Sequence, residues 1–377
     1  MTIHRFAFPT DIHFGPGARR EAAAYLAAQG CKRPLIVIDK GIAALPLLGE
    51  FKSTLQGLAV EVFAGVAGNP VTSQVDAGVA AFSQHRADAV IGLGGGAALD
   101  VAKAVALMAV HPGSVLEYAW DHPQVRPIEH ELPCFIALPT TAGTGSEVGR
   151  SSVISDDTTH IKKIIFSVKL LAKAVFADPE LTLDLPAGVT AATGMDALTH
   201  NVESYLSPAY HPLCDGIALE GARIAAHALE TAVKNGRNIQ ARSDMMMSSM
   251  MGAIAFQKDL GAVHSCAHAL GTVTDMHHGL ANGIMIDHVM RFNIDAAGKK
   301  MAELARVCGA GESAESFVTW LAALKQRIGI PAKLGDKGVT REHIARLVEI
   351  AVNDTCHQTN PKPVSAADFQ RIFSGAI

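Results

Sequence analysis

The segment from residue 87 to residue 103 constrains the fold most, because it joins a buried strand to a helix through three consecutive glycines. Ala87–Leu93 has the apolar composition of a buried strand, and the Gly94–Gly96 triplet leads into the helical run Ala97–Lys103. Glycine N–H groups can approach a phosphate closely, and a helix N-terminus adds partial positive charge. A plain tight turn would look similar, because the spacing is not Gly-x-Gly-x-x-Gly. The segment therefore predicts a strand–turn–helix unit that is suited to phosphate.

Short apolar runs alternate with longer helical runs up to about residue 180, a pattern typical of a parallel α/β sheet. Further strands are predicted at Pro34–Asp39, Val60–Phe63 and Cys134–Pro139. The last of these strands runs into Thr140–Ser146, a loop rich in hydroxyl groups and glycine. Parallel sheets bind ligands at the carboxyl ends of their strands. Two such loops after two strands favour a single bound nucleotide.

From about Pro186 onward the chain has the pattern of helices joined by short Gly, Pro or Asn breaks. A chain of 377 residues is also too long for one ordinary core. We therefore expect a Rossmann-like α/β dinucleotide-binding domain over residues 1–183 and an all-α domain over residues 184–377.

Composition and charge argue against several kinds of partner. The formal net charge of -4 gives no basic surface for nucleic acid or an anionic membrane. No apolar run approaches the ~20 residues of a membrane span, and the first residues lack the features of a signal peptide. The six cysteines are scattered and form no Cys-x-x-Cys pair. We expect a cytoplasmic protein that binds neither nucleic acid nor membrane.

Two histidine-containing stretches stand out in the helical half. Asp196 and His200 are four residues apart, as are His264 and His268, so each pair lies on one face of a helix; His277 and His278 follow. A single histidine on an apolar helix face is more often a core residue that has a partner. Here, each polar side chain buried among Ala, Leu and Val would cost ~1–3 kcal/mol without a partner. One divalent cation would satisfy several of these side chains together.

The ligand chemistry indicates which ion and which reaction to expect. A carboxylate with imidazoles suits Fe(II) or Zn(II) and argues against Mg or Ca. A catalytic site also keeps one position open for substrate, whose oxygen the metal polarises. Beside two loops suited to a nucleotide, such a site predicts nicotinamide redox chemistry.

Five motifs, in this order along essentially the whole chain, resemble the iron-type (group III) alcohol dehydrogenases. They are Gly94–Lys103, Pro139–Val148, Gly194–His200, His264–His268 and His278–Asn282. The resemblance implies the fold shared by dehydroquinate synthase and these dehydrogenases, with an N-terminal dinucleotide-binding domain and a helical C-terminal domain. It also implies a homodimer or a larger homo-oligomer.

The resemblance assigns roles to individual residues by position. The family's four metal ligands fall on Asp196, His200, His264 and His278, and His268 matches the histidine that relays protons. His277 stands where many members have proline, and we expect it to lie behind the ligands. The NAD groove would be lined by Asp39, Asn69, Gly95, Gly96, Asp100, Thr140, Thr141, Thr144 and Lys162.

Asp39 bears on the choice of coenzyme. A carboxylate at the end of this strand can accept hydrogen bonds from the adenosine ribose and would repel a 2′-phosphate, which favours NAD over NADP. The alternative is a helix or turn cap, because Asp39 is followed by Lys-Gly.

Two cations depart from the usual family pattern. Lys258 lies in the shortened segment Ala255–Gly261, and Arg150 follows the Thr-Gly-Ser-Glu loop. Both resemble the 4-hydroxybutyrate dehydrogenase branch, as does the tail His357–Pro361. A cation near the site would bind the far carboxylate of an ω-hydroxy acid, and Phe256 is a further candidate for substrate contact. Alternatively, both cations are solvated or ion-paired.

These observations predict a metal-dependent, NAD(H)-linked alcohol dehydrogenase or aldehyde reductase. Its small-molecule substrate would be a short-chain primary alcohol or an ω-hydroxy acid such as 4-hydroxybutyrate, and its metal Fe(II) or Zn(II). Two alternatives remain open: a lyase that resembles dehydroquinate synthase, and a metal-dependent hydrolase without NAD. The full set of His264, His268 and His278 argues against the lyase.

Overall fold

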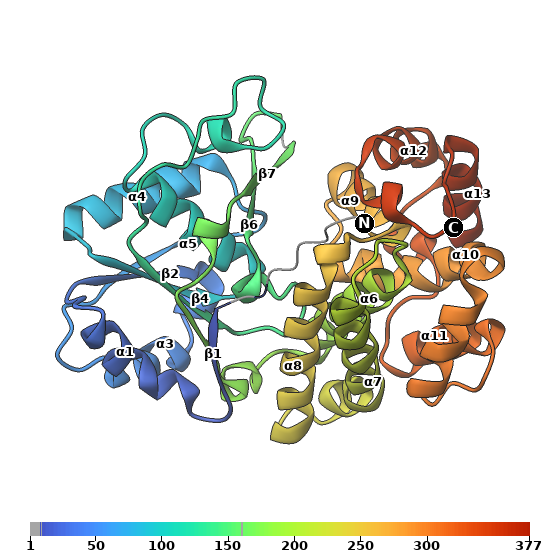
Figure 1. The fold of residues 1–377 in the computed structure, drawn as a ribbon, viewed down its shortest axis with the longest axis horizontal. Helices are drawn as coiled ribbons and strands as arrows, with labels where there is room; N and C mark the ends of the chain where they lie inside the picture. The colour runs from blue at the N-terminus through green and yellow to red at the C-terminus, as the bar shows by residue number, and fades with distance from the viewer. Residues whose placement is uncertain (1–7, 9, 160) are drawn as a thin grey trace, which may run out of the picture. The chain divides into compact units, whose positions relative to one another are not determined.

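A computed structural model of the chain describes residue 8, residues 10–159 and residues 161–377 (Figure 1). The start of the first expected domain, residues 1–7, lies outside the described residues. The described residues form two compact units, one of residues 8–141 and 145–182 and the other of residues 142–144 and 183–377.

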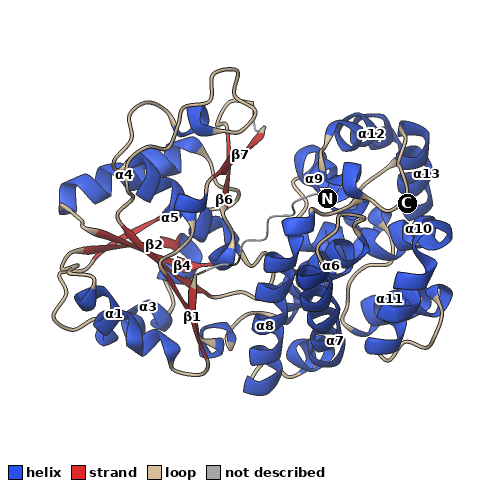
Figure 2. Cartoon of the chain, viewed as in Figure 1, coloured by secondary structure: helices blue, strands red, loops and turns tan. Residues whose placement is uncertain are grey.

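The first unit is built on a parallel sheet of six strands in the order β1-β8-β5-β4-β2-β3. A second, antiparallel pair is formed by β6 and β7. Red arrows mark the strands in Figure 2. The strands are β1 (Asp11–Phe14), β2 (Pro34–Asp39), β3 (Glu61–Val66), β4 (Ala89–Gly94), β5 (Cys134–Pro139), β6 (Ser151–Ser155), β7 (Lys162–Phe166) and β8 (Ala174–Ala177).

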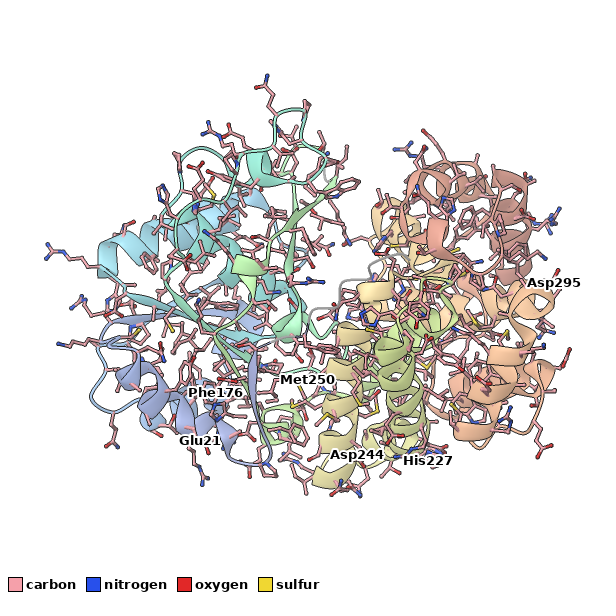
Figure 3. The ribbon with its side chains drawn as sticks, viewed as in Figure 1. Glu21, Phe176, His227, Asp244, Met250 and Asp295 are labelled. Atoms are coloured by element: carbon pink, nitrogen blue, oxygen red, sulfur yellow. The ribbon has the colours of Figure 1, made fainter. Side chains whose placement is uncertain are left out.

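Helices cover both faces of this sheet, with α1 and α3 on one face and α4 and α5 on the other (Figure 1). Because both faces are covered, the central strands β2 and β4 are buried almost throughout. Figure 3 shows Phe176 of β8 inside this unit, where its side chain is fully buried. The helices of the unit are α1 (Ala22–Ala28), α2 (Lys40–Ala43), α3 (Pro46–Thr54), α4 (Thr72–His85) and α5 (Gly96–Met108).

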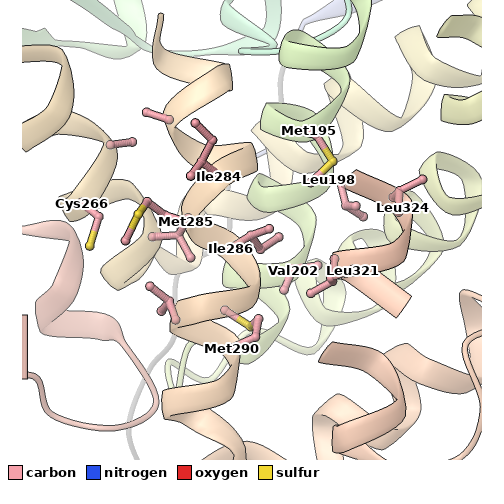
Figure 4. Close-up of a cluster of buried hydrophobic side chains, with 14 of the residues drawn as sticks. Met195, Leu198, Val202, Cys266, Ile284, Met285, Ile286, Met290, Leu321 and Leu324 are labelled. Atoms are coloured by element: carbon pink, nitrogen blue, oxygen red, sulfur yellow. The ribbon is translucent and has the colours of Figure 1, made fainter. Parts of the chain in front are cut away.

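The second unit is helical. Its core joins α6, α9, α10 and α11 through buried side chains that include Met195, Cys266, Met285 and Leu321 (Figure 4). Polar residues such as Asp295 lie at the surface of this unit (Figure 3). The helices are α6 (Ala187–Leu206), α7 (Pro212–Lys234), α8 (Ile239–Ala255), α9 (Ala262–Thr274), α10 (His278–Val307), α11 (Ala314–Arg327), α12 (Ile344–Asn353) and α13 (Ala366–Ala376).

This architecture confirms the predicted fold class, a parallel α/β sheet followed by a helical region. The predicted strands Pro34–Asp39 and Cys134–Pro139 have the observed bounds of β2 and β5. None of the described helices combines the length and the apolar character that crossing a membrane requires.

Candidate functional site

Helix α6 carries two of the four expected ligands. Asp196 and His200 lie one turn apart on its buried part and are 2% and 4% exposed. Glycines let neighbouring helices approach this face closely: a Cβ on Gly252 would lie 2.9 Å from His200 Cβ, and one on Gly279 would lie 2.3 Å from the Ala192 carbonyl. Close approach of α8 and α10 therefore depends on these two glycines.

The other two expected ligands come from α9 and from the first residue of α10. His264 is 1% exposed, whereas the His278 side chain is 28% exposed. The Oδ1 atom of Asp196 lies 3.9 Å from His200 Nε2, 3.8 Å from His264 Nε2 and 3.4 Å from His278 Nε2. One ligand atom from each of the four side chains lies within 4.8 Å of the others. The structure thus gathers all four around one point, with the more open side at His278.

The protonation states of His264 and Asp196 suit metal binding. Burial, together with the neighbouring histidines, lowers the pKa of His264 well below its ordinary value, so the imidazole is neutral. Burial alone would raise the pKa of Asp196, but His200, His278 and a hydrogen bond from Asn282 outweigh it and lower that pKa. Neutral imidazoles and an ionised carboxylate are the forms that bind a cation.

Glu203, which the sequence did not single out, holds His264 from behind. Its Oε2 lies 2.6 Å from His264 Nδ1, and its Oε1 accepts a 2.7 Å hydrogen bond from the Val263 N–H at the start of α9. Glu203 is almost fully buried, and burial raises its pKa, whereas hydrogen bonds from the backbone N–H groups of Val263, Gly261 and His264 oppose that shift. With Nδ1 engaged by this carboxylate, Nε2 is left to face Asp196.

Asn282, one turn after His278 on α10, touches the cluster directly. Its fully buried side-chain amide donates to Asp196 Oδ1 at 2.7 Å and lies 3.2 Å from His278 Nε2. Asn282 closes the expected motif His278–Asn282, but sequence spacing alone gave it no role. Its contact fixes the orientation of the Asp196 carboxylate.

His268 lies beside the cluster and has its own carboxylate partner. Its ring stacks on that of His278 with centroids 5.4 Å apart, and its Nδ1 lies 2.7 Å from Asp354 Oδ2. Burial opposes ionisation of Asp354, yet His268, Ser265 and the Cys356 N–H together lower its pKa. Asp354 is therefore an ionised acceptor that orients the His268 imidazole.

Two more expected residues lie beside a ligand or at the end of a helix that carries one. Phe256 lies next to His200, with ring centroids 5.4 Å apart. His277 caps α10, because its side chain accepts a hydrogen bond from the Leu280 N–H. The two residues therefore have different positions, one against a ligand ring and the other at a helix end.

The two cations considered for substrate binding lie in different surroundings. Lys258 is 1% exposed, and its ammonium group forms an ion pair with Asp215. The Arg150 guanidinium belongs to the α/β unit and lies over the Phe166 ring, 5.2 Å from its centroid. Ion pairing, the alternative left open by the sequence, is what the structure shows for Lys258.

In the α/β unit, several expected coenzyme residues meet at the carboxyl ends of β2, β4 and β5. The chain passes from β2 outward to β3 and returns to β4 on the other side, so the order reverses between β2 and β4. Asp39 ends β2 and accepts a hydrogen bond from the Gly95 N–H, and a Cβ on Gly95 would lie 3.3 Å from Thr141. Such a reversal point is where α/β sheets bind ligands.

Burial raises the pKa of Asp39 to about 6. The Asp39 carboxylate lies so close to residue 94 that this position requires glycine: φ is +154°, and a Cβ would collide with the carboxylate. Gly96 begins α5, and Thr140 donates its N–H to the Gly94 carbonyl at 3.0 Å. This edge therefore combines a carboxylate with a helix N-terminus.

The remaining expected coenzyme residues are more dispersed. Asp100 accepts hydrogen bonds from the Ser146 hydroxyl at 2.6 Å and the Val153 N–H at 3.0 Å. Burial raises the pKa of Asp100, and Lys103 and, more weakly, Lys162 oppose that shift. Asn69 follows β3, at the same edge, whereas Thr144 is grouped with the helical unit. The two oxygens of Asp100 are thus used within the protein.

Lys103, which the sequence did not single out, anchors the loop after β5. It is fully buried, and its ammonium donates to the Ser146 carbonyl at 2.7 Å, the Ser146 hydroxyl at 2.8 Å and the Ser151 carbonyl at 2.8 Å. Burial lowers the pKa of Lys103, while Asp100 and Glu147 oppose that shift. The loop therefore depends on a buried cation for its shape.

Comparisons with known proteins agree with this geometry. The family model "Iron-containing alcohol dehydrogenase" matches residues 9–179, and "Fe-containing alcohol dehydrogenase family, C-terminal" matches residues 190–377. The chain is 39% identical to a 4-hydroxybutyrate dehydrogenase of Cupriavidus necator, covering 98% of each chain. It is 35% identical to a 1,3-propanediol dehydrogenase of Klebsiella pneumoniae, covering 99% of this chain and 98% of that one.

A solved structure extends the comparison to the fold. Sulfoacetaldehyde reductase from Bifidobacterium kashiwanohense, in complex with NAD+, superposes with a TM-score of 0.90 at 30% identity, covering 100% of this chain and 99% of that one. None of these comparisons supports the alternative of a lyase or a hydrolase. The chain belongs to the iron-containing alcohol dehydrogenase family and is an oxidoreductase.

Proposed function

We propose that this chain is an NAD(H)-linked dehydrogenase of primary alcohols in which Asp196, His200, His264 and His278 hold one divalent metal ion. One observation carries the proposal: four side chains from three helices bring ligand atoms within 4.8 Å of one another in a buried setting. One carboxylate with three imidazoles fits Fe(II), which the family implies, and also Zn(II).

A divalent ion held by these four residues would supply Lewis-acid polarisation of the alcohol oxygen, and bound NAD would supply the hydride acceptor. The chain's own residues orient the ligands and move the proton. Glu203 holds His264 through Nδ1, and Asn282 holds the Asp196 carboxylate. Asp354 holds His268 through Nδ1, so His268 Nε2 is the atom that takes the alcohol proton toward solvent. Replacing His268 with alanine should lower turnover about 10²–10⁴-fold while the metal content stays unchanged.

Coenzyme choice is assigned to Asp39 at the reversal point of the sheet. Its carboxylate would accept the ribose hydroxyl groups of NAD and repel the additional phosphate of NADP. The test is Asp39→Gly with turnover measured for both coenzymes. We expect NADP turnover to rise relative to NAD, and an unchanged preference would refute the assignment.

The substrate class follows from the relatives and from Arg150. The relatives named above oxidise 4-hydroxybutyrate and 1,3-propanediol, according to their names. We propose a short-chain primary alcohol or an ω-hydroxy acid, with Phe256 in contact with the substrate and Arg150 binding the far carboxylate. The ion pair between Lys258 and Asp215 makes Lys258 the weaker of the two cations for this role. Arg150→Ala should therefore raise the Michaelis constant for 4-hydroxybutyrate more than that for butanol, and Lys258→Ala serves as the comparison.

The decisive experiment strips the protein of metal and reloads it anaerobically with Fe(II) or with Zn(II). NADH formation is then followed by absorbance with butanol, 1,3-propanediol and 4-hydroxybutyrate. A metal-dependent signal supports the dehydrogenase, and the strongest signal identifies the substrate and the more active metal. No signal with any of these alcohols would overturn the proposed function.

The quaternary structure and the compartment are part of the same proposal. We place the enzyme in the cytoplasm as a homodimer or a larger homo-oligomer, as the family resemblance implies. Light scattering of the purified protein tests the assembly, and a monomer at micromolar concentration would refute it.

A further inference from the structure

A second group of metal-ligating side chains lies outside the four-residue cluster. His268 on α9 meets Asp354 and Cys356, which follow α12, and one ligand atom from each lies within 4.8 Å of the others. Among the described residues, these two groups are the sets of three or more His, Cys, Asp or Glu side chains that meet this criterion. The second group combines nitrogen, oxygen and sulfur donors, a set that selects a thiophilic divalent ion.

The carboxylate of this group is already fixed in place. Asp354 Oδ1 accepts hydrogen bonds from the Ser265 hydroxyl at 2.7 Å and from the Cys356 N–H at 2.9 Å. The same Ser265 oxygen accepts the His357 N–H at 2.9 Å, so the segment is tied to α9 at two points. These bonds leave Oδ2 directed at His268 Nδ1, 2.7 Å away. Supporting bonds of this kind orient ligands in known metal sites.

The group is also accessible, unlike the buried ligands Asp196 and His264. The side chains of His268 and Asp354 are 30% and 17% exposed, and Cys356 is partly exposed. An ion could therefore enter from solvent while three protein ligands leave a fourth position to water.

We propose that His268, Asp354 and Cys356 form a second, inhibitory metal site that binds Zn(II) or Cd(II). The ion binds one imidazole nitrogen, one carboxylate oxygen and the Cys356 thiolate, whose proton is released to solvent; no oxidation state changes. Tetrahedral Zn ligands lie about 3.3 Å apart at bond lengths near 2 Å, so the Nδ1 to Oδ2 distance must open by about half an ångström. A metal ion bound to His268 would prevent that histidine from relaying protons and would therefore inhibit the enzyme. The inhibition rests on the proposed function of His268, whereas the binding of the ion does not.

The test uses the holoenzyme loaded anaerobically with Fe(II) and titrated with Cd(II). Three quantities are measured: bound iron and cadmium per chain, the ultraviolet charge-transfer band of cadmium thiolate, and dehydrogenase activity. Wild type should retain its iron, gain one cadmium with a thiolate band, and lose activity over the same concentration range. Cys356→Ser should bind this cadmium at least about 100-fold more weakly, and Ser265→Ala about 10-fold more weakly, because a ligand or its support is lost.

Cys134→Ser is the matched control, because Cys134 is also partly exposed but lies on β5 of the other unit. It should behave as wild type in all three measurements. A thiolate band that persists in Cys356→Ser, or cadmium that merely replaces iron, would overturn the second site. A band that depends on Cys356 in a protein without dehydrogenase activity would instead keep the site and refute the proposed function. If cadmium binds through Cys356 and activity is unaffected, the inhibitory role is wrong.

Discussion

Replacing Glu203 with glutamine should weaken metal binding without unfolding the helical unit. Glu203 accepts hydrogen bonds from the first N–H groups of α9 and lies 2.6 Å from His264 Nδ1. Glutamine has one acceptor oxygen, so if it serves the backbone N–H groups, the amide NH₂ faces His264 Nδ1. The imidazole proton must then move to Nε2, the atom that faces Asp196. Loss of such a supporting carboxylate costs about 10–100-fold in metal affinity, which is about 1.4–2.8 kcal/mol.

The assay is competition for Zn(II) between the protein and a chelator of known affinity, in a Cys356→Ser background that removes a ligand of the proposed second site. Thermal unfolding of the metal-free protein is measured in parallel. Glu147→Gln is the matched control, because Glu147 is equally buried but belongs to the α/β unit. We expect Glu147→Gln to retain wild-type metal affinity. Wild-type affinity in Glu203→Gln would refute the reasoning that this carboxylate selects the His264 tautomer.

Three further predictions concern the α/β unit. Burial raises the pKa of the Asp39 carboxyl group to about 6 from 3.8, because the folded protein favours the protonated form. The contribution of the protonated carboxyl group to stability is therefore complete below pH 4 and is lost as the group ionises and pH rises through 6. Asp39→Asn should therefore stabilise the protein above pH 6, by up to about 3 kcal/mol, and should leave it unchanged near pH 4, as measured by urea unfolding at several pH values. Gly94→Ala should lower the free energy of unfolding by about 1–3 kcal/mol, because the new Cβ collides with Asp39, and should weaken NADH binding in a fluorescence titration. Gly298→Ala is the control: its Cβ lies in open space on α10, so it should raise the free energy of unfolding by about 0.5–1 kcal/mol. Lys103→Met leaves Asp100 and two loop carbonyls without their cation, so it should lower the free energy of unfolding by about 3–5 kcal/mol, as measured with denaturant. A decrease below about 1 kcal/mol would contradict the role of this lysine in the loop.

Strands with continuous apolar sequence were predictable, whereas the four-residue strands and the β6–β7 pair were not. Pro34–Asp39 and Cys134–Pro139 are six-residue runs with clear boundaries, and the structure has them unchanged. β1 and β8 have four residues each, too few for a reliable pattern, and they are recognised only through their pairing with each other and, for β8, with β5. The β6–β7 hairpin was missed because its strands are only five residues long and are joined by a polar turn.

In the candidate site, residues that are close in the sequence were predictable, whereas partners that are distant in the sequence were not. The pairs Asp196 with His200 and His264 with His268 were recognised because each shows helical spacing within one segment. Glu203 lies 61 residues before His264, and Asp354 lies 86 residues after His268, so no local pattern connects them. Such carboxylates are identified only when the chain is folded.

The junction between α9 and α10 connects metal binding with the local stability of the helical unit. α9 ends at Thr274 and α10 begins at His278, so only three residues separate a helix that carries His264 from a helix that begins with a ligand. Asp275 in this junction has a left-handed backbone, with φ of +51°. An ion shared by both helices would hold the junction closed, since binding to the native state opposes local opening. Chains without the ion would then open more readily at this junction than chains that hold it, so the metal would stabilise this part of the fold locally as well as take part in the chemistry.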